Sequence, residues 1–131
     1  MKKTLLLATL ISGFYAVSCN DPDKVSFNED EFLKCWTYSY EESAGVDGNL
    51  FRPCDFMEFP ASYFRSRFTL FENNEATYLQ VSPVDAHEIR PGTWSFDTDA
   101  NVLTIKSTSG QTVYRYQVIK LETEKLIVKP E

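Results

Sequence analysis

The sequence is poor in the residues that most often carry out chemistry: it has one histidine, three cysteines and no Cys-x-x-Cys pair. A zinc site usually needs four nitrogen, sulfur or oxygen ligands, and a Ser-His-Asp triad needs a histidine held by a partner. His87 stands alone in Asp-Ala-His-Glu and is expected to be a solvated loop residue. We therefore predict no metal site, no cofactor and no catalytic residues.

Glycine-rich phosphate loops and basic runs are also missing. None of the five glycines belongs to a nucleotide-binding fingerprint. The acidic pairs Glu41-Glu42 and Asp97/Asp99 stand at turn-like positions, where carboxylates normally face water. The sequence thus makes no positive case for an enzyme. The net charge is −6 and the arginines are scattered, which argues against nucleic acid as a partner.

The N-terminus has the layout of an export signal. Lys2 and Lys3 precede a mostly apolar stretch over residues 5–17, which is too short for a spanning helix. Ala16-Val17-Ser18-Cys19 resembles a bacterial lipobox, with alanine where leucine is more usual. The resemblance implies cleavage after residue 18 and a lipid on Cys19. The alternative is an ordinary signal with an accidental cysteine nearby.

By that resemblance the protein is a lipoprotein of the outer membrane, on its periplasmic or cell-surface face. Several acyl chains on Cys19 would anchor it stably. Residues 20–24 (Asn-Asp-Pro-Asp-Lys) are expected to form a polar tether. Their acidic residues resemble the surface-export signals of some Gram-negative lipoproteins, although a plain solvated linker fits them equally well.

Length and composition predict one small β-domain. Removal of residues 1–18 leaves 113, the usual size of one domain, and aromatic residues, which favour strands, make up 15% of the chain. We divide the chain into a signal (1–18), a lipidated cysteine and tether (19–32) and a barrel domain (33–131). A short helix is expected within 25–34, capped by Ser26 or Asn28.

The two remaining cysteines, Cys35 and Cys54, form an even pair in an exported domain. Because the compartment is oxidising, we predict a disulfide between them. Two separate buried thiols are the main alternative. A zinc pair lacks partners, since there is only one histidine.

Alternation of large and small residues predicts about eight strands. Asn73 and Asn74 are expected to form a two-residue hairpin loop that places Leu70 opposite Thr77 and Phe68 opposite Leu79. Such a meander hides its edges best by closing, so the predicted fold is an all-β, up-and-down antiparallel barrel. A long loop is expected at 41–62, with one short strand near 47–57. The other strands are expected around Trp36 and at 63–71, 75–82, 93–96, 102–106, 112–121 and 125–129.

The order and spacing of these features resemble the small lipocalin-like lipoproteins of Bacteroidetes-type bacteria. The resemblance covers about residues 33–129 and implies a lipocalin-like barrel. It rests on a first-strand Trp36, the hairpin from Phe68 to Asn74, Gly92-Thr93-Trp94, Leu103 with Ile105, and the run Tyr116, Val118, Leu121, Leu126 and Val128.

A barrel of eight strands can hold one small ligand or be filled by its own side chains. Our first hypothesis is a non-catalytic barrel that binds a small apolar or glycan-like ligand, or a protein partner, in the cell envelope. The alternative is a filled barrel that acts through its loops at 41–62 and 83–92. The candidate ligand-binding residues are six aromatics that are expected to point inward: Trp36, Tyr38, Trp94, Phe96, Tyr114 and Tyr116.

Overall fold

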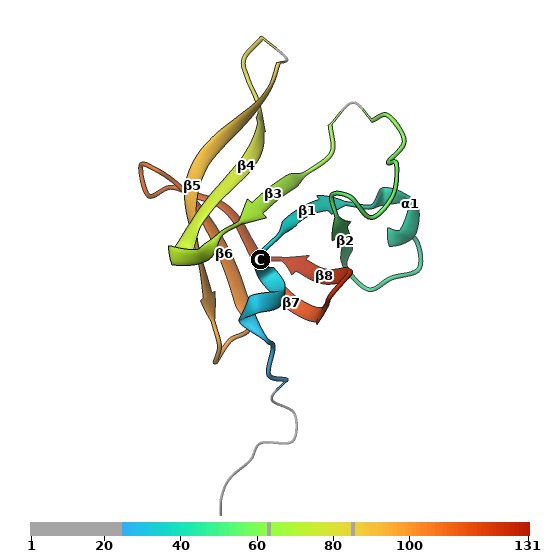
Figure 1. The fold of residues 1–131 in the computed structure, drawn as a ribbon, viewed down its shortest axis with the longest axis vertical. Helices are drawn as coiled ribbons and strands as arrows, with labels where there is room; N and C mark the ends of the chain where they lie inside the picture. The colour runs from blue at the N-terminus through green and yellow to red at the C-terminus, as the bar shows by residue number, and fades with distance from the viewer. Residues whose placement is uncertain (1–24, 63, 85) are drawn as a thin grey trace, which may run out of the picture.

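Eight antiparallel strands close into one barrel in the computed structural model, which describes residues 25–62, 64–84 and 86–131 (Figure 1). The predicted all-β barrel is thereby confirmed. No helix in these ranges is long and apolar enough to cross a bilayer. The elements are η1 (Glu29–Phe32), β1 (Cys35–Tyr38), α1 (Tyr40–Ser43), β2 (Asn49–Pro53), β3 (Arg67–Leu70), η2 (Glu72–Asn74), β4 (Glu75–Val81), β5 (His87–Asp97), β6 (Val102–Ser107), β7 (Thr112–Glu122) and β8 (Lys125–Pro130).

The meander runs without interruption from β3 to β8, and the first two strands close the circle in exchanged order. β1 lies between β2 and β3, while β2 pairs with β8. The chain must therefore return from the end of β2 to the start of β3, which lies at the opposite end of β1. Residues 54–62 and 64–66, here called the return segment, lie along the outside of β1. Thr37, whose neighbour Trp36 points inward, is only 5% exposed beneath this return segment.

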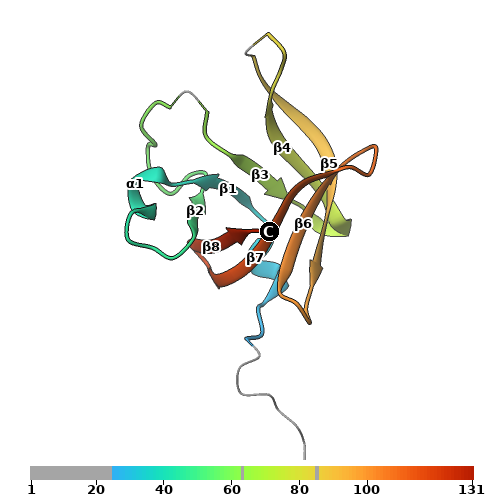
Figure 2. The same ribbon diagram turned by 180° about the vertical axis from the view of Figure 1, so that it is seen from behind.

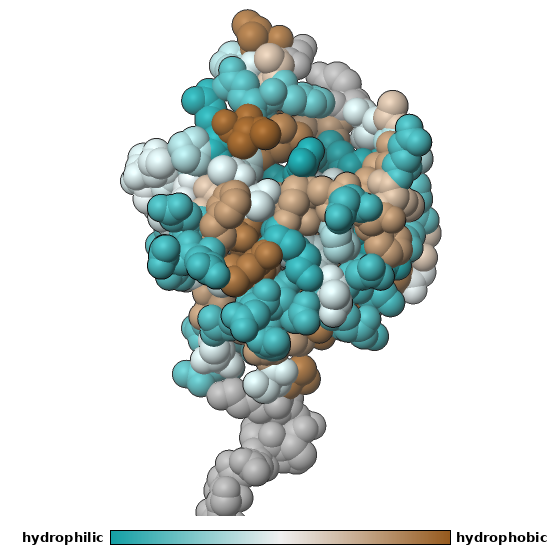
Figure 3. All heavy atoms as spheres, in the orientation of Figure 1, coloured by the Kyte–Doolittle hydropathy of each residue, from teal (hydrophilic) through white to brown (hydrophobic). Residues whose placement is uncertain are grey.

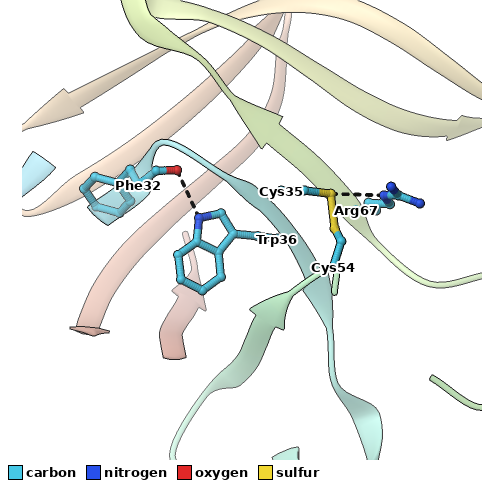
Figure 4. The surroundings of a disulfide bond; sticks show 5 residues. All are labelled: Phe32, Cys35, Trp36, Cys54 and Arg67. Atoms are coloured by element: carbon cyan, nitrogen blue, oxygen red, sulfur yellow. Dashed lines mark hydrogen bonds between the residues drawn. A yellow bond between two sulfur atoms is a disulfide. The ribbon is translucent and has the colours of Figure 1, made fainter. Parts of the chain in front are cut away.

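A disulfide between Cys35 and Cys54 joins the start of β1 to the beginning of the return segment, as predicted (Figure 4). The backbone N–H of Cys54 donates to the carbonyl of Cys35 at 3.1 Å. Arg67 on β3 donates through Nε to Cys35 Sγ at 3.2 Å. The bridge thus fixes the point at which the chain leaves the barrel wall.

The 3-10 helix η1 closes the barrel end at which β1 begins. Asn28 caps it, because its side-chain oxygen accepts from the Asp30 N–H at 3.2 Å. Phe32 is fully buried, with its ring centroid 4.9 Å from that of Phe96 and 6.0 Å from that of Trp94. The expected short helix is thus present as a 3-10 helix, and its buried Phe32 acts as a plug at this end of the barrel.

The inward residues of β5 to β8 are those that the alternation predicts. Phe96 and Tyr114 are half-buried against the core. The others are buried: Trp94, Leu103, Ile105, Tyr116, Val118, Leu126 and Val128.

The β3–β4 hairpin exists, but its predicted register is wrong by one residue. The loop has three residues, because the Phe71 N–H donates to the Glu75 carbonyl at 2.9 Å, and Asn73 and Asn74 both take positive φ. Phe68 therefore pairs with Tyr78, and Leu70 pairs with Ala76. Tyr78 and Ala76 face the interior in place of Leu79 and Thr77.

The predicted loop at 83–92 is also corrected, because β5 begins at His87. β3 pairs with β4 only up to Tyr78, and β6 pairs with β5 only from Gly92 onward. Residues 79–84 and 86–91 therefore form a two-stranded ribbon, here called the arm, which projects past the barrel (Figures 1 and 2). At its base Gly92 lets β5 approach β6, since a Cβ there would lie 2.2 Å from the Lys106 carbonyl oxygen.

Candidate ligand-binding site

A cavity of about 440 Å³ opens at the barrel end opposite η1, where β4 and β6 end and β3 and β7 begin. This volume lies within the usual range for small-molecule sites, about 300–1,000 Å³. We call it the mouth cavity. It is lined by Phe64, Tyr78, Leu79, Gln80, Val81, Ser107, Ser109, Gln111, Thr112, Val113 and Tyr114.

None of the described residues that line the mouth cavity carries a charged side chain. Aromatic rings come from the return segment (Phe64), from β4 (Tyr78) and from β7 (Tyr114). Amides and hydroxyls come from the arm and from the β6–β7 turn, where Ser107 and Ser109 share a hydrogen bond of 2.8 Å between their Oγ atoms. The site therefore combines flat apolar surfaces with neutral polar groups.

All five tyrosines of the described residues gather around this end of the barrel. The rings of Tyr38 and Tyr40 lie 4.2 Å apart between centroids, and those of Tyr114 and Tyr116 stack at 5.5 Å. Burial raises the pKa of the Tyr114 and Tyr116 hydroxyls. Both phenols therefore stay protonated and neutral across the physiological range.

Aromatic rings close the floor beneath the mouth cavity. The ring centroids of Phe51 and Phe68 lie 5.3 Å apart, and Tyr116 lies 6.0 Å from Phe51. Phe68 and Phe51 are only 1% exposed. Because these rings pack against one another across the barrel interior, the cavity is a shallow cup above a filled core.

Phe64, on the rim of the cup, is held by a clamp around Arg65. The guanidinium forms a bidentate pair with Glu41 at 2.8 and 3.0 Å and donates to the carbonyls of Tyr38 and Pro60. The hydrogen bond from Arg65 also lowers the pKa of the Glu41 carboxyl. Tyr40 completes the clamp, because its hydroxyl donates to the Phe64 carbonyl at 2.7 Å.

The structure divides the six predicted ligand-binding residues between the two ends of the barrel. Trp36, Trp94 and Phe96 pack at the η1 end, where the Trp36 Nε1–H donates to the Phe32 carbonyl at 3.1 Å. Tyr38, Tyr114 and Tyr116 lie at the mouth end, and Tyr114 lines the cavity. A ligand-binding role for any of the six stays a prediction.

Sequence reasoning missed most of the polar lining. Gln80 belongs to the arm, where both faces meet solvent and alternation gives no signal. Gln111 and Ser109 lie in a turn, a position at which polar residues are expected in any case. The one-residue error in register placed Tyr78 on the outer face of β4. A hairpin loop of three residues, Glu72, Asn73 and Asn74, would have placed its side chain toward the interior.

A second cavity, of about 570 Å³, lies beside the disulfide on the outer surface. Of the charged residues in its lining, Lys34 donates through Nζ to the Thr123 carbonyl at 2.7 Å and pairs with Glu31. This contact joins the β7–β8 turn to the residue that precedes β1.

Within the described ranges, no group of three or more histidine, cysteine, aspartate or glutamate side chains is placed to hold a metal ion. Cys19, the predicted lipidation site, and the predicted signal over residues 1–18 lie outside the described residues. Comparisons with protein-family models, with curated proteins and with solved structures find no match to this chain.

Proposed function

We propose that this protein is a lipid-anchored, non-catalytic binding protein of the cell envelope that holds a small uncharged ligand in its mouth cavity. The proposal rests on two independent features of the chain. The N-terminal pattern ending at Cys19 supports export and anchoring at the outer membrane. The cup at the far end of the barrel supports ligand binding.

One observation carries the binding proposal: the mouth cavity has both the size and the mixed lining of a small-molecule site. Binding sites of this kind are concave and largely apolar, with a few polar groups that orient the ligand. The filled interior supports a ligand held at the rim, above the ring of Tyr116, and not one enclosed in the barrel.

The test is native mass spectrometry of the mature domain purified from its own host. We expect a small molecule to copurify with the wild type. Ser109→Trp should displace it, because an indole at that position fills the cup. Thr98→Trp is the matched control, since Thr98 is equally exposed but lies in the turn at the other end of the barrel. Repeated absence of any bound mass, or its retention by Ser109→Trp, would contradict the proposal.

A second candidate function, interaction with a protein partner, is favoured by the apolar surface of the arm. Val84 is 83% exposed and Ile89 is 66% exposed, and Figure 3 shows hydrophobic surface at the tip and on the side of this hairpin. The Ser82 hydroxyl accepts from the N–H groups of Val84 and Ala86 and so fixes the tip. Exposed apolar patches mark interaction sites, whereas single exposed apolar residues are common on any protein surface.

The arm is tested with a photo-crosslinking residue in place of Val84 in living cells, with the same residue at Thr98 as control. If the arm binds a protein partner, position 84 should give one discrete crosslinked product, and Ile89→Ser should remove it. Nonspecific crosslinking at the same level as from position 98 would contradict a role of the arm in binding.

A further inference from the structure

We propose that the ligand of the mouth cavity is a neutral carbohydrate, one or two sugar rings in size, and not a fatty acid or another chain-like lipid. This inference rests on the proposed binding function and names its ligand class. It is carried by three features of the cup: its charge, the chemistry of its walls and its depth.

The cup excludes a charged ligand. Among the residues that the structure describes, no lysine, arginine, aspartate or glutamate lines it, and the nearby Arg65 is already neutralised by its bidentate pair with Glu41. Burying an ionic group without a partner is costly. A carboxylate or phosphate would find no counter-charge on the wall, so the ligand is neutral.

The walls match a molecule whose faces are apolar and whose edges carry hydroxyls. Phe64, Tyr78 and Tyr114 supply ring surfaces, against which the C–H face of a sugar ring packs. Gln80 and Gln111 supply carboxamides, each with two N–H donors and an acceptor oxygen. A sugar hydroxyl both donates and accepts a hydrogen bond, and so do the amides and hydroxyls that face it.

The depth of the cup argues against an alkyl chain. A long alkyl chain bound end-on would need a tunnel into the barrel. The stacked pair Tyr114–Tyr116 and the neighbouring rings of Phe68 and Phe51 occupy that space, with centroids 5.3–6.4 Å apart. Much of the remaining wall is polar. An alkyl group lying across the mouth would cover these polar groups without offering them a hydrogen bond, which costs binding free energy.

The experiment is a titration of ¹⁵N-labelled mature domain, followed by amide resonances. The probes are neutral disaccharides (cellobiose, maltose, lactose and chitobiose), with decanol as the apolar probe. We expect at least one disaccharide to shift the resonances of the β6–β7 turn and of β4. Gln111→Ala should weaken this binding about fivefold to tenfold, the loss of one neutral hydrogen bond.

Gln117→Ala is the matched control, because Gln117 lies on β7, the strand that follows Gln111, but donates to the Ala100 carbonyl at the other end of the barrel. It should leave the sugar affinity unchanged. If decanol shifts the mouth resonances and no disaccharide does, the carbohydrate inference is overturned and the binding function stands. If neither sugar nor decanol shifts them, both are overturned. Sugar-induced shifts confined to other surfaces, or an equal effect of both variants, would also overturn the inference.

Discussion

At the residue scale, Trp36 shows how one side chain ties the end plug to the barrel (Figure 4). It is fully buried, and its indole N–H donates to the carbonyl of the equally buried Phe32. Trp36→Phe removes the donor and part of the ring, and it leaves that carbonyl without its partner. We expect the free energy of unfolding to fall by about 2–3 kcal/mol, measured by urea denaturation.

Trp94→Phe is the matched control, because the Trp94 N–H donates to the carbonyl of Phe71, a residue that is 45% exposed. Water can replace that donor, so the loss should be about 1 kcal/mol smaller. An equal or larger loss for Trp94→Phe would show that the plug does not depend on the Trp36 hydrogen bond.

Glu42 predicts how stability responds to acid. Its carboxylate accepts from Arg52 at 2.7 and 2.8 Å, which lowers its pKa from the ordinary 4.5 to about 2. A carboxyl with a lowered pKa in the folded state stabilises the protein above its unfolded pKa, and it loses this contribution as the pH falls through the folded pKa. The loss therefore runs from about pH 4.5 down to about pH 2.

The measurement is urea denaturation at pH 6 and at pH 3. Because the pair is partly exposed, we expect Glu42→Gln to remove about 1 kcal/mol at pH 6 and less at pH 3. Glu58→Gln, at an exposed position, is the control and should change neither value. A Glu42→Gln defect that is equal at both pH values would contradict the assignment.

At the scale of elements, strands with one core face and one solvent face could be predicted from the sequence. β6, β7 and β8 lie within one residue of the predicted ranges, because buried apolar residues recur at every second position, as at Leu103 and Ile105 in β6 and at Leu126 and Val128 in β8. The first half of β5 could not be predicted in this way. It is solvated on both faces in the arm and contains Pro91, so it carries no period-two signal.

Local backbone chemistry explains the other differences. The positive φ of Asn73 and Asn74 fits both a two-residue and a three-residue loop, and the choice between them moves every side chain of β4 to the opposite face. The helical turn α1 lies in a region where glycine and proline dominate the pattern. It is held by tertiary contacts, above all the pairs of Glu41 and Glu42 with the arginines of later segments.

The disulfide, which links the start of β1 to the residue after β2, is predicted to stabilise the pairing of these two strands. Cys35 and Cys54 are separated by 19 positions, and closing a loop of that size contributes about 3 kcal/mol in the chain-entropy model. We expect the double variant Cys35→Ala/Cys54→Ala to lose about 2–4 kcal/mol of stability in urea denaturation. Reduction of the wild type should lower its stability by a similar amount and leave the double variant unchanged. A wild type insensitive to reductant would contradict the prediction.

At the scale of the whole molecule, the sequence predicted the barrel better than the site. Inward-facing residues follow from alternation along each strand, whereas the mouth cavity is assembled from four separate segments: the return segment, β4, the β6–β7 turn and β7. Which loops meet at one end depends on the strand order. The exchange of β1 and β2 that brings Phe64 to the rim has no counterpart in any local pattern.

The positions of the tether and of the mouth cavity at opposite ends of the barrel predict how an anchored molecule would be oriented on the membrane. Val25, the first described residue, lies at the η1 end, where its carbonyl accepts from Asn101 in the β5–β6 turn. A lipid on Cys19 would hold this end near the bilayer through residues 20–24, which span at most about 17 Å. Because the tether leaves from this end and the mouth cavity lies at the other, the mouth should point away from the membrane.

The test uses lipidated protein in liposomes that contain a headgroup-labelled acceptor lipid. A donor fluorophore is attached at Thr98→Cys, at the anchored end, or at Ser109→Cys, at the mouth; both positions are exposed turns. We expect the more efficient energy transfer from position 98, because that turn lies on the bilayer side. Equal transfer from both positions would mean that the tether lets the barrel tumble freely. More efficient transfer from position 109 would turn the mouth toward the membrane, and a cup facing lipid is the wrong geometry for a water-soluble sugar.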